Sequence, residues 1–209
     1  MTEKSNTETR CSRTCHGKHK RDKRGPTSYK MHNSELVFEK LALTEGTIFL
    51  DLGCGPGDYS VHAAKDIGAT GKVYALDREA RMLEEVSKLA SSNGLTNIEA
   101  ISADMTLPLP FKAQSVDYCF ISTALHCIDL GKHGSALFKE INRVLKDSGQ
   151  LAILECKKER ADYGPPYHMR ISAEEIKAVT TPLNFAETGY IDLGCNYLLQ
   201  LSKLTVQGK

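Results

Sequence analysis

The chain has 209 residues, of which 41% are hydrophobic, and this size and composition suit one domain with a full core. Its formal net charge of +1 hides an asymmetry: residues 1–24 carry eight basic and three acidic side chains, whereas the rest carries 19 basic and 23 acidic ones. No apolar run approaches the ~20 residues that span a bilayer, and no signal-peptide core follows Met1, so we expect a cytoplasmic protein without a membrane span.

Residues 1–24 contain almost no apolar side chains, so we expect a basic tail ahead of one domain over 25–209. Cys11, Cys15 and His19 would share one face of a helix and offer zinc two thiolates and an imidazole. The spacing is not that of a standard zinc finger, so a basic arm without metal stays the alternative. The basic run 18–24 suits nucleic acid or an acidic partner, but the acidic body disfavours a nucleic acid substrate.

The rest of the chain alternates between strand patterns and helix patterns. A loop over 25–33 precedes a helix, for which Ser34 is the expected cap. We then expect strands over 48–52, 72–77, 98–102, 116–121 and 150–156, and helices over 58–68, 79–93, 134–146 and 172–181. Strands separated by helices predict βαβ units, and therefore a mostly parallel sheet with helices on both faces. Two last strands, over 185–192 and 196–203, predict a closing hairpin.

The segment Leu50-Asp51-Leu52-Gly53-Cys54-Gly55-Pro56-Gly57-Asp58-Tyr59 has the strand–loop–helix order that brings backbone N–H groups to a ligand. A dinucleotide motif needs its third glycine three places after the second, where this chain has Asp58. Instead, the pattern acidic-x-Gly-x-Gly-x-Gly resembles motif I of the class I S-adenosylmethionine-dependent methyltransferases. The resemblance implies their Rossmann-like fold, with a seven-stranded, mostly parallel sheet and a C-terminal hairpin.

Two further segments carry the same resemblance. Residues 107–111 followed by Ser115-Val116-Asp117 resemble a stretch that precedes the fourth strand in this superfamily. Residues 138–150 resemble its E-x-x-R-V-L-K-P-G-G segment, with Asp147-Ser148 in place of Pro-Gly. The resemblance covers about residues 34–203. It is greatest for the type 11 methyltransferases, which include quinone-biosynthesis and arsenite methyltransferases.

Ligands of such sheets lie beyond the carboxyl ends of the strands. By resemblance, Asp51 contacts the amino group of S-adenosylmethionine and Asp77 its ribose hydroxyls. Asp104 contacts the adenine amino group, and Met105 packs on the ring. A lone Asp after a strand is ordinarily a turn or cap residue, so the prediction depends on all three together. The expected cofactor residues are Asp51, Gly53, Cys54, Gly55, Gly57, Asp77, Arg78, Asp104, Met105 and Ser122.

Methyl transfer from a sulfonium is an in-line displacement, for which the protein aligns a nucleophile and, where needed, removes a proton. His126, after the fourth strand, is the candidate base or substrate contact, and packing is its alternative role. We expect Tyr29 and His32 to cover the cofactor, and the loop 157–170 to select the substrate. The expected substrate residues are Tyr29, His32, Tyr163, Tyr167 and Arg170.

The expected function is methyl transfer to a small molecule or a thiol. The alternatives are a protein or RNA methyltransferase that docks through its basic arm, and a non-catalytic protein that binds S-adenosylmethionine or metal. Seven cysteines at irregular spacing favour reduced thiols over disulfides. Four of them offer ligands to a trivalent arsenical, but the paired cysteines of arsenite methyltransferases are not found here; these four are Cys119, Cys127, Cys156 and Cys195. The sequence leaves the oligomeric state open.

Overall fold

The computed structural model describes Arg24 and residues 27–204, and the tail residues Cys11, Cys15 and His19 lie outside this range. Within it, seven strands form one sheet: β1 (Ile48–Leu52), β2 (Lys72–Asp77), β3 (Ile98–Ser102), β4 (Val116–Ser122), β5 (Leu145–Cys156), β6 (Phe185–Asp192) and β7 (Asn196–Lys203). The α-helices of this part of the chain are α1 (Ser34–Leu41), α2 (Asp58–Asp66), α3 (Ala80–Ser92), α4 (Leu130–Val144) and α5 (Ala173–Thr180).

The sheet has the strand order β3-β2-β1-β4-β5-β7-β6. All neighbouring pairs are parallel except those that β7 makes with β5 and β6, so β7 alone runs against the others. The chain winds outward from β1 to β3 and then returns to place β4 on the other side of β1. This reversal puts the topological switch point, where ligands of open α/β sheets bind, between β1 and β4.

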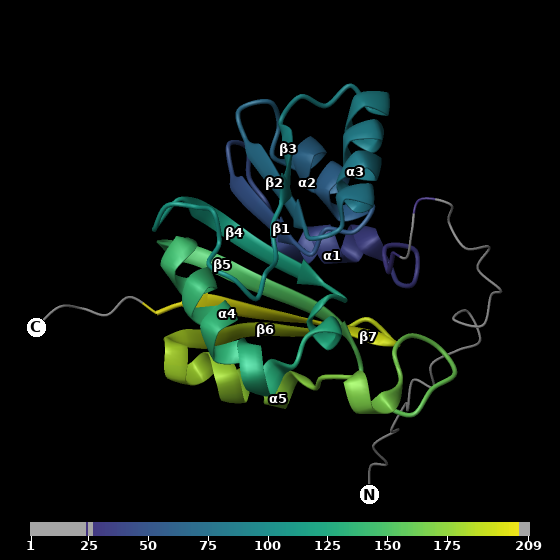
Figure 1. Ribbon diagram of the computed structural model, residues 1–209, viewed down its shortest axis with the longest axis vertical. Coiled ribbons are helices and arrows are strands. Elements are labelled where there is room, and N and C mark those ends of the chain that lie inside the picture. Colours follow the sequence, from purple (N-terminus) through teal and green to yellow (C-terminus); the bar gives the residue numbers. More distant parts are fainter. Residues whose placement is uncertain (1–23, 25–26, 205–209) are drawn as a thin grey trace, which may run out of the picture.

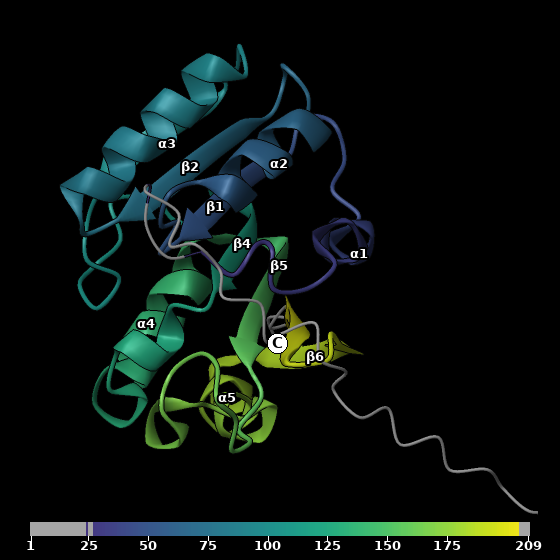
Figure 2. The same cartoon turned by 90° about the vertical axis from the view of Figure 1, so that its right-hand side faces the viewer.

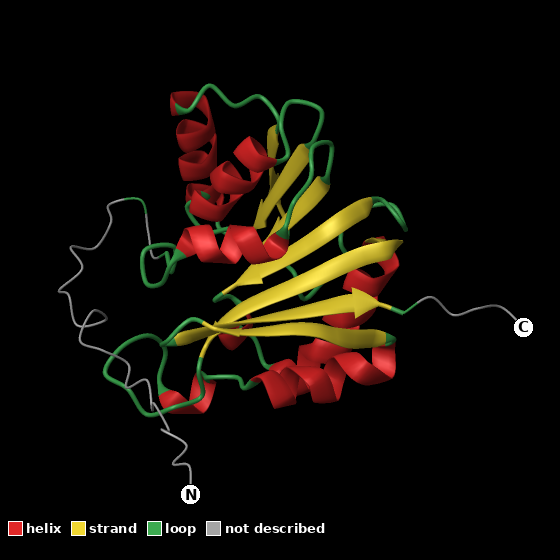
Figure 3. Cartoon of the chain, turned by 180° about the vertical axis from the view of Figure 1, so that it is seen from behind, coloured by secondary structure: helices red, strands yellow, loops and turns green. Residues whose placement is uncertain are grey.

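Helices cover both faces of the twisted sheet (Figures 1 and 3). Because strand residues alternate between faces, Phe49 packs in a core with α1 and α2, while its neighbour Leu50 packs in a core with α4 and α5. Helix α3 lies beside α2 and packs Val86 against Ala75 of β2. Figure 2 shows α4 and α5 on the side of the sheet opposite to α2 and α3. The predicted architecture, with seven strands, helices on both faces and a closing hairpin, is therefore confirmed.

Most strand bounds agree with those expected from the sequence, but the expected first cap is wrong. Asn33, not Ser34, caps α1, because its side-chain oxygen accepts a hydrogen bond from the Leu36 N–H at 3.1 Å. The chain needs an extended residue at this place, and Asn33 adopts that conformation while Ser34 is already helical.

The expected junction between the fourth main helix and the fifth strand is also wrong. Helix α4 begins at Leu130 rather than at 134, because the Asp129 carboxylate accepts the Lys132 N–H at 3.1 Å. It ends at Val144, since Leu145 pairs with Val116 at the start of β4 and thus already belongs to β5.

None of the helices that the structure describes has the length and apolar character needed to cross a bilayer.

Candidate functional site

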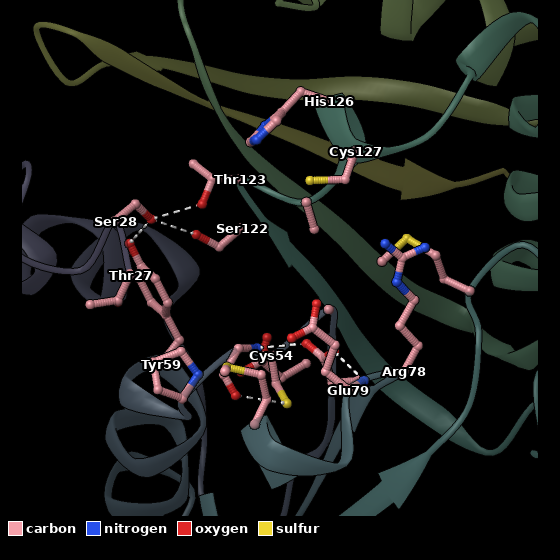
Figure 4. Close-up of a pocket in the computed structure, with 18 of the residues that line it drawn as sticks. Thr27, Ser28, Cys54, Tyr59, Arg78, Glu79, Ser122, Thr123, His126 and Cys127 are labelled. Atoms are coloured by element: carbon pink, nitrogen blue, oxygen red, sulfur yellow. Dashed lines mark hydrogen bonds between the residues drawn. The ribbon is translucent and has the colours of Figure 1, made fainter. Parts of the chain in front are cut away.

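A cavity of about 400 Å³ lies at the carboxyl edge of the sheet, where the loops after β1 to β4 meet (Figure 4). Segments far apart in the sequence line it together, because the carboxyl ends of parallel strands share one edge. It has the size of a ligand pocket. Among the expected site residues, those that line it are Asp51, Gly53, Cys54, Gly55, Asp77, Arg78, Asp104, Met105, Ser122 and His126.

The backbone of the glycine loop lies very close to the end of β2 and to the loops that follow β3 and β4. Gly53 has φ +80°, and a Cβ on it would lie 2.7 Å from the Ala124 Cβ and 2.8 Å from the Met105 Cε. Its N–H donates to the carbonyl of Leu76 at 2.8 Å, which ties the loop to the end of β2. A side chain at position 53 would therefore fill the space between the β1 loop and the loops of β3 and β4.

Asp51 is a buried carboxyl at the base of this loop, with 1% of its surface exposed. Burial raises its pKa to about 7; a hydrogen bond from the Ser60 hydroxyl, 2.5 Å from Oδ2, opposes this rise, and the nearby Asp77 charge adds to it. A carboxyl in this environment gains from a cationic partner, which would restore the charge that burial disfavours.

Asp77 and Asp104 follow the next two strands. The Asp77 carboxylate is held by two backbone donors, with the Gly55 N–H 3.0 Å from Oδ2 and the Glu79 N–H 2.9 Å from Oδ1. Asp104 accepts the N–H and the hydroxyl of Thr106 on Oδ1, each at 2.8 Å, and these bonds lower its pKa. Asp104 is thus oriented by its own turn, and Asp77 by its own turn and the glycine loop; both carboxylates keep oxygen lone pairs for a ligand.

A buried hydroxyl network joins the N-terminal segment to the sheet. The Ser28 Oγ lies 3.1 Å from the Tyr59 hydroxyl and 3.0 Å from the Ser122 Oγ, and it accepts the Thr123 hydroxyl at 3.2 Å. Figure 4 shows these contacts on one side of the cavity. The N-terminal segment therefore forms one wall of the cavity through Thr27 and Ser28.

His126 extends into the cavity from the 3-10 turn at Leu125–Cys127 (Figure 4). Its Nδ1 lies 3.1 Å from Oε2 of Glu155, which is fully buried near the end of β5. Burial alone would lower the pKa of His126, but hydrogen bonds and charge interactions with Cys127 and Glu155 raise it to about 10. This environment therefore favours the protonated ring. The expected role of His126 as a base or substrate contact stays a prediction.

Six residues expected at the site are absent from the lining of the cavity, and three of them lie near α2. Gly57 has φ +89°, and a Cβ there would lie 2.8 Å from the Val86 Cγ2, so Gly57 serves the packing of α2 against α3. Tyr29 and His32 lie behind Tyr59. The Tyr29 hydroxyl bonds to His62 at 2.6 Å, and the His32 Nε2 to the Tyr59 hydroxyl at 2.9 Å.

The expected substrate residues of the loop 157–170 serve the loop itself. Arg170 has 2% of its surface exposed and donates to the carbonyls of Pro165, Lys157 and Tyr163. The Tyr163 hydroxyl donates to the carbonyl of Cys195 at 3.1 Å, and the ring of Tyr167 is 47% exposed. The loop reaches the cavity instead through Gly164 and Pro165. Arg170, with His168 and Met169, lines a second cavity of about 440 Å³.

Sequence reasoning assigned no role at the site to three lining or supporting residues, which are Ser28, Tyr59 and Glu155. A signal existed for Glu155, because it is a carboxyl near the end of a predicted strand at the same edge of the sheet. No pattern pointed to Ser28, whose partners are 31 or more positions away. Among the described residues, no group of three or more His, Cys, Asp or Glu side chains is placed to hold a metal ion.

A doubly wound sheet whose carboxyl-end loops enclose a carboxylate-lined cavity is typical of α/β proteins that bind nucleoside ligands. A family model described as a methyltransferase domain matches residues 43–187. The chain belongs to this family, as a class I S-adenosylmethionine-dependent methyltransferase of the type 11 group. The family resemblance of the glycine loop is thereby confirmed.

Relatives and solved structures agree with this membership. Demethylmenaquinone methyltransferases of Lactobacillus johnsonii and Staphylococcus aureus are 34% and 33% identical over 118 and 130 residues, or 56% and 61% of this chain. The matched regions span about half of those relatives, 47% and 52%. A SAM dependent methyltransferase from Aquifex aeolicus superposes with a TM-score of 0.76 at 26% identity, over 84% of this chain and 92% of that one. The [4+2]-cyclase SpnF shares the fold, with a TM-score of 0.70 at 19% identity over 82% of this chain and 80% of its own.

Proposed function

We propose that the chain transfers the methyl group of S-adenosylmethionine to a small-molecule acceptor by in-line displacement. One observation carries the proposal: the carboxyls of Asp51, Asp77 and Asp104, from the ends of β1, β2 and β3, line the same cavity as the glycine loop. The names of the demethylmenaquinone methyltransferases support a quinone-type acceptor.

The residues of the cavity fit the proposed cofactor. Asp51 is a buried carboxyl with a raised pKa that suits an ammonium group, and the Asp77 carboxylate is fixed by two N–H groups with lone pairs free for two ribose hydroxyls. The absence of a side chain at Gly53 lets Met105 pack directly against the glycine loop, where a Cβ would lie 2.8 Å from its Cε. When bound, the cofactor supplies an electrophilic methyl group on a sulfonium.

The protein's own part is then to orient the cofactor and the acceptor and to exclude water from the cavity. Ser28, Ser122 and Thr123 close one side of the cavity with a hydroxyl network, and Gly164 and Pro165 contribute to another. Holding the acceptor in line with the methyl carbon replaces a bimolecular encounter with a positioned one, which is the main contribution expected of such a site.

Calorimetric titration with S-adenosylmethionine and S-adenosylhomocysteine tests the cofactor. We expect Asp77→Ala to weaken binding at least about tenfold, because charged hydrogen bonds contribute about 1.5–3 kcal/mol. Asp66→Ala is the matched control, since Asp66 ends α2 and is absent from the cavity lining. Unchanged affinity in Asp77→Ala would contradict the proposed site.

Turnover with a labelled methyl donor in a cell extract tests the acceptor. We expect label in the low-molecular-weight fraction, and less of it with Asp77→Ala protein at a donor concentration below saturation. Label found only in protein or RNA would overturn the small-molecule proposal and support docking of a macromolecule. Binding of the cofactor without any turnover would support the non-catalytic alternative.

A further inference from the structure

The cofactor cavity and the second cavity share one wall. His126, Cys127 and Ile128 line both cavities. In Figure 4 the side chains of His126 and Cys127 lie on the opposite side of the cofactor cavity from Cys54 and Glu79. A molecule in the second cavity would therefore meet the cofactor cavity at the ring of His126.

Glu155 fixes that ring from within the core. It is 0% exposed, and its Oε1 accepts the Leu125 N–H at 2.9 Å while its Oε2 contacts His126 Nδ1 at 3.1 Å. A fully buried carboxylate is retained only where donors surround it, and here they come from the turn that carries His126. Because a carboxylate only accepts hydrogen bonds, Nδ1 carries the hydrogen. Nε2 then accepts in the neutral ring and donates to a ligand in the imidazolium, which the Glu155 carboxylate favours.

Among the cations that line the second cavity, Arg170 has its donors on the carbonyls of Pro165, Lys157 and Tyr163, whereas His126 lines both cavities. Lys158 is paired with Glu175, with Nζ 2.5 Å from Oε1, and Asp129 is used in capping α4. Glu155 contacts His126 from the buried side, and interactions with Cys127 also raise the pKa of the imidazole. The titratable and charged groups around His126 are Glu155 in the core and, along the second cavity, Cys127, Asp129, Lys158, His168, Arg170 and Glu175.

Building on the proposed methyl transfer, we propose that Glu155 is a positioning residue that holds His126 as a charged hydrogen-bond donor to an oxyanion of the methyl acceptor. The acceptor class is then a phenolate, an enolate or a carboxylate, bound where the two cavities meet. The body of the acceptor would then lie in the second cavity, and His126 would bind its negatively charged oxygen.

The reaction balances without a base. A new bond joins the acceptor's nucleophilic atom to the methyl carbon, the carbon–sulfur bond breaks, and its electron pair stays on sulfur. The acceptor has already lost its proton to water, so its negative charge cancels the positive charge of the sulfonium and both products are neutral. The proton of His126 stays on the ring throughout, because a charged donor stabilises the bound anion.

The test uses the full chain saturated with S-adenosylhomocysteine, and two probes of similar shape. 4-Nitrophenol reports ionisation by its absorbance, and nitrobenzene is the neutral control. We expect nitrophenolate to bind wild type more tightly than nitrobenzene. Glu155→Gln and His126→Gln should each weaken nitrophenolate binding about tenfold, the effect of one charge-assisted hydrogen bond, while nitrobenzene binding changes little. Benzoate in place of nitrophenol distinguishes a carboxylate from a phenolate site.

Matched controls separate this inference from the proposed function. Glu159→Gln removes a carboxylate from the exposed loop and should leave nitrophenolate binding unchanged. Binding of S-adenosylhomocysteine should be unchanged in Glu159→Gln. If wild type does not bind it, the proposed function is wrong, and the preference for nitrophenolate over nitrobenzene is then measured on the ligand-free chain. If wild type prefers neither anion over nitrobenzene, or if His126→Gln keeps that preference, the role of Glu155 and His126 is wrong. His126→Gln decides the matter should Glu155→Gln fail to fold.

Discussion

At the scale of single residues, the cavity depends on the missing side chain of Gly53. We expect Gly53→Ala to lower the free energy of unfolding by about 2–5 kcal/mol, because the positive φ costs about 1–2 kcal/mol and overpacking costs about 1–3 kcal/mol. The added methyl group would meet Ala124 and Met105, so S-adenosylhomocysteine binding should fall as well. Urea denaturation and calorimetry measure the two effects.

Gly94 offers the control for backbone strain. Its φ is +67°, but a Cβ on it would have nothing within 4 Å. Gly94→Ala should therefore cost only about 1–2 kcal/mol and leave cofactor binding unchanged. Equal losses of stability in the two variants would show that Gly53 is required for its backbone conformation alone.

Asp51 makes cofactor affinity depend on pH. Its carboxyl has a pKa of about 7, raised chiefly by burial, so it is largely neutral below that pH and ionised above it. Since an α-amino group stays mostly charged below about pH 7.7, affinity should rise from about pH 5.5 to 7.5 as the carboxylate forms. Calorimetry across this range measures the effect, and Asp51→Asn should bind weakly with little dependence on pH. A flat wild-type profile would contradict contact between Asp51 and the amino group.

The raised pKa of Asp51 makes the stability of the ligand-free chain fall with rising pH, opposite to the expected rise in cofactor affinity. A carboxyl whose folded pKa lies above its unfolded value near 4 favours the folded state at low pH. That contribution is lost as the pH rises toward about 7. Asp51 thus stabilises the fold less at the pH at which it binds the cofactor best, as expected of a group kept for function.

The carboxyls at strand ends were accessible to sequence reasoning, whereas contacts formed by tertiary packing were not. Asp77 and Asp104 follow recognisable strands, so their meeting at one edge follows from parallel pairing. Ser28 has no local pattern, because its partners come from α2 and β4. His126 was found, but its charge state was not, since that depends on the buried Glu155 29 positions away.

At the scale of elements, the loop 157–170 is organised by one buried guanidinium. Arg170 donates to three backbone carbonyls of this loop and lies over the ring of Tyr163, with Cζ 4.9 Å from its centroid. These contacts set the position of Gly164, where a Cβ would lie 3.0 Å from the Cys156 Sγ. The loop therefore acts as one unit in forming the wall of the cavity.

We expect Arg170→Met to lower the free energy of unfolding by about 2–3 kcal/mol, since it leaves three partly buried carbonyls without their donors. It should also expose the Lys157–Arg160 segment to trypsin. Arg160→Met is the matched control, because Arg160 is exposed and stacks only on the surface ring of Tyr167. Similar cleavage rates of Arg170→Met and wild type would show that the loop keeps its place without Arg170.

Helix α4 begins earlier than expected from its sequence, because a side-chain cap compensates for residues of low helix propensity. Gly131 and Gly134 lower the helical signal at the start of α4, and the Asp129 cap offsets it. The closing hairpin was expected at its observed bounds, because the Leu193–Cys195 turn separates two clear strand patterns. At α4 the local signals conflict, whereas at the hairpin they agree.

At the scale of the whole molecule, the cavity joins the two halves of the sheet. Its lining comes from the loops after β1, β2 and β3 on one side of the switch point, and from the loops after β4 and β5 on the other. Ser28 adds the N-terminal segment through contacts to Tyr59 of α2 and Ser122 of β4. A ligand bound there stabilises parts of the chain that are remote in sequence, so its effect should be global.

We expect S-adenosylhomocysteine at about 100 times its Kd to raise the free energy of unfolding by about 2.7 kcal/mol, with the transition remaining single. For a chain of this size the midpoint of thermal unfolding should rise by about 5–10 °C. Ser28→Ala should weaken cofactor affinity and reduce this shift at a fixed ligand concentration, because the N-terminal wall loses its three hydroxyl contacts. Ser87→Ala, on the exposed face of α3, should keep the full shift. Two separate transitions in the presence of ligand would show that the halves of the sheet unfold independently, since a ligand that contacts only one half can stabilise only that half.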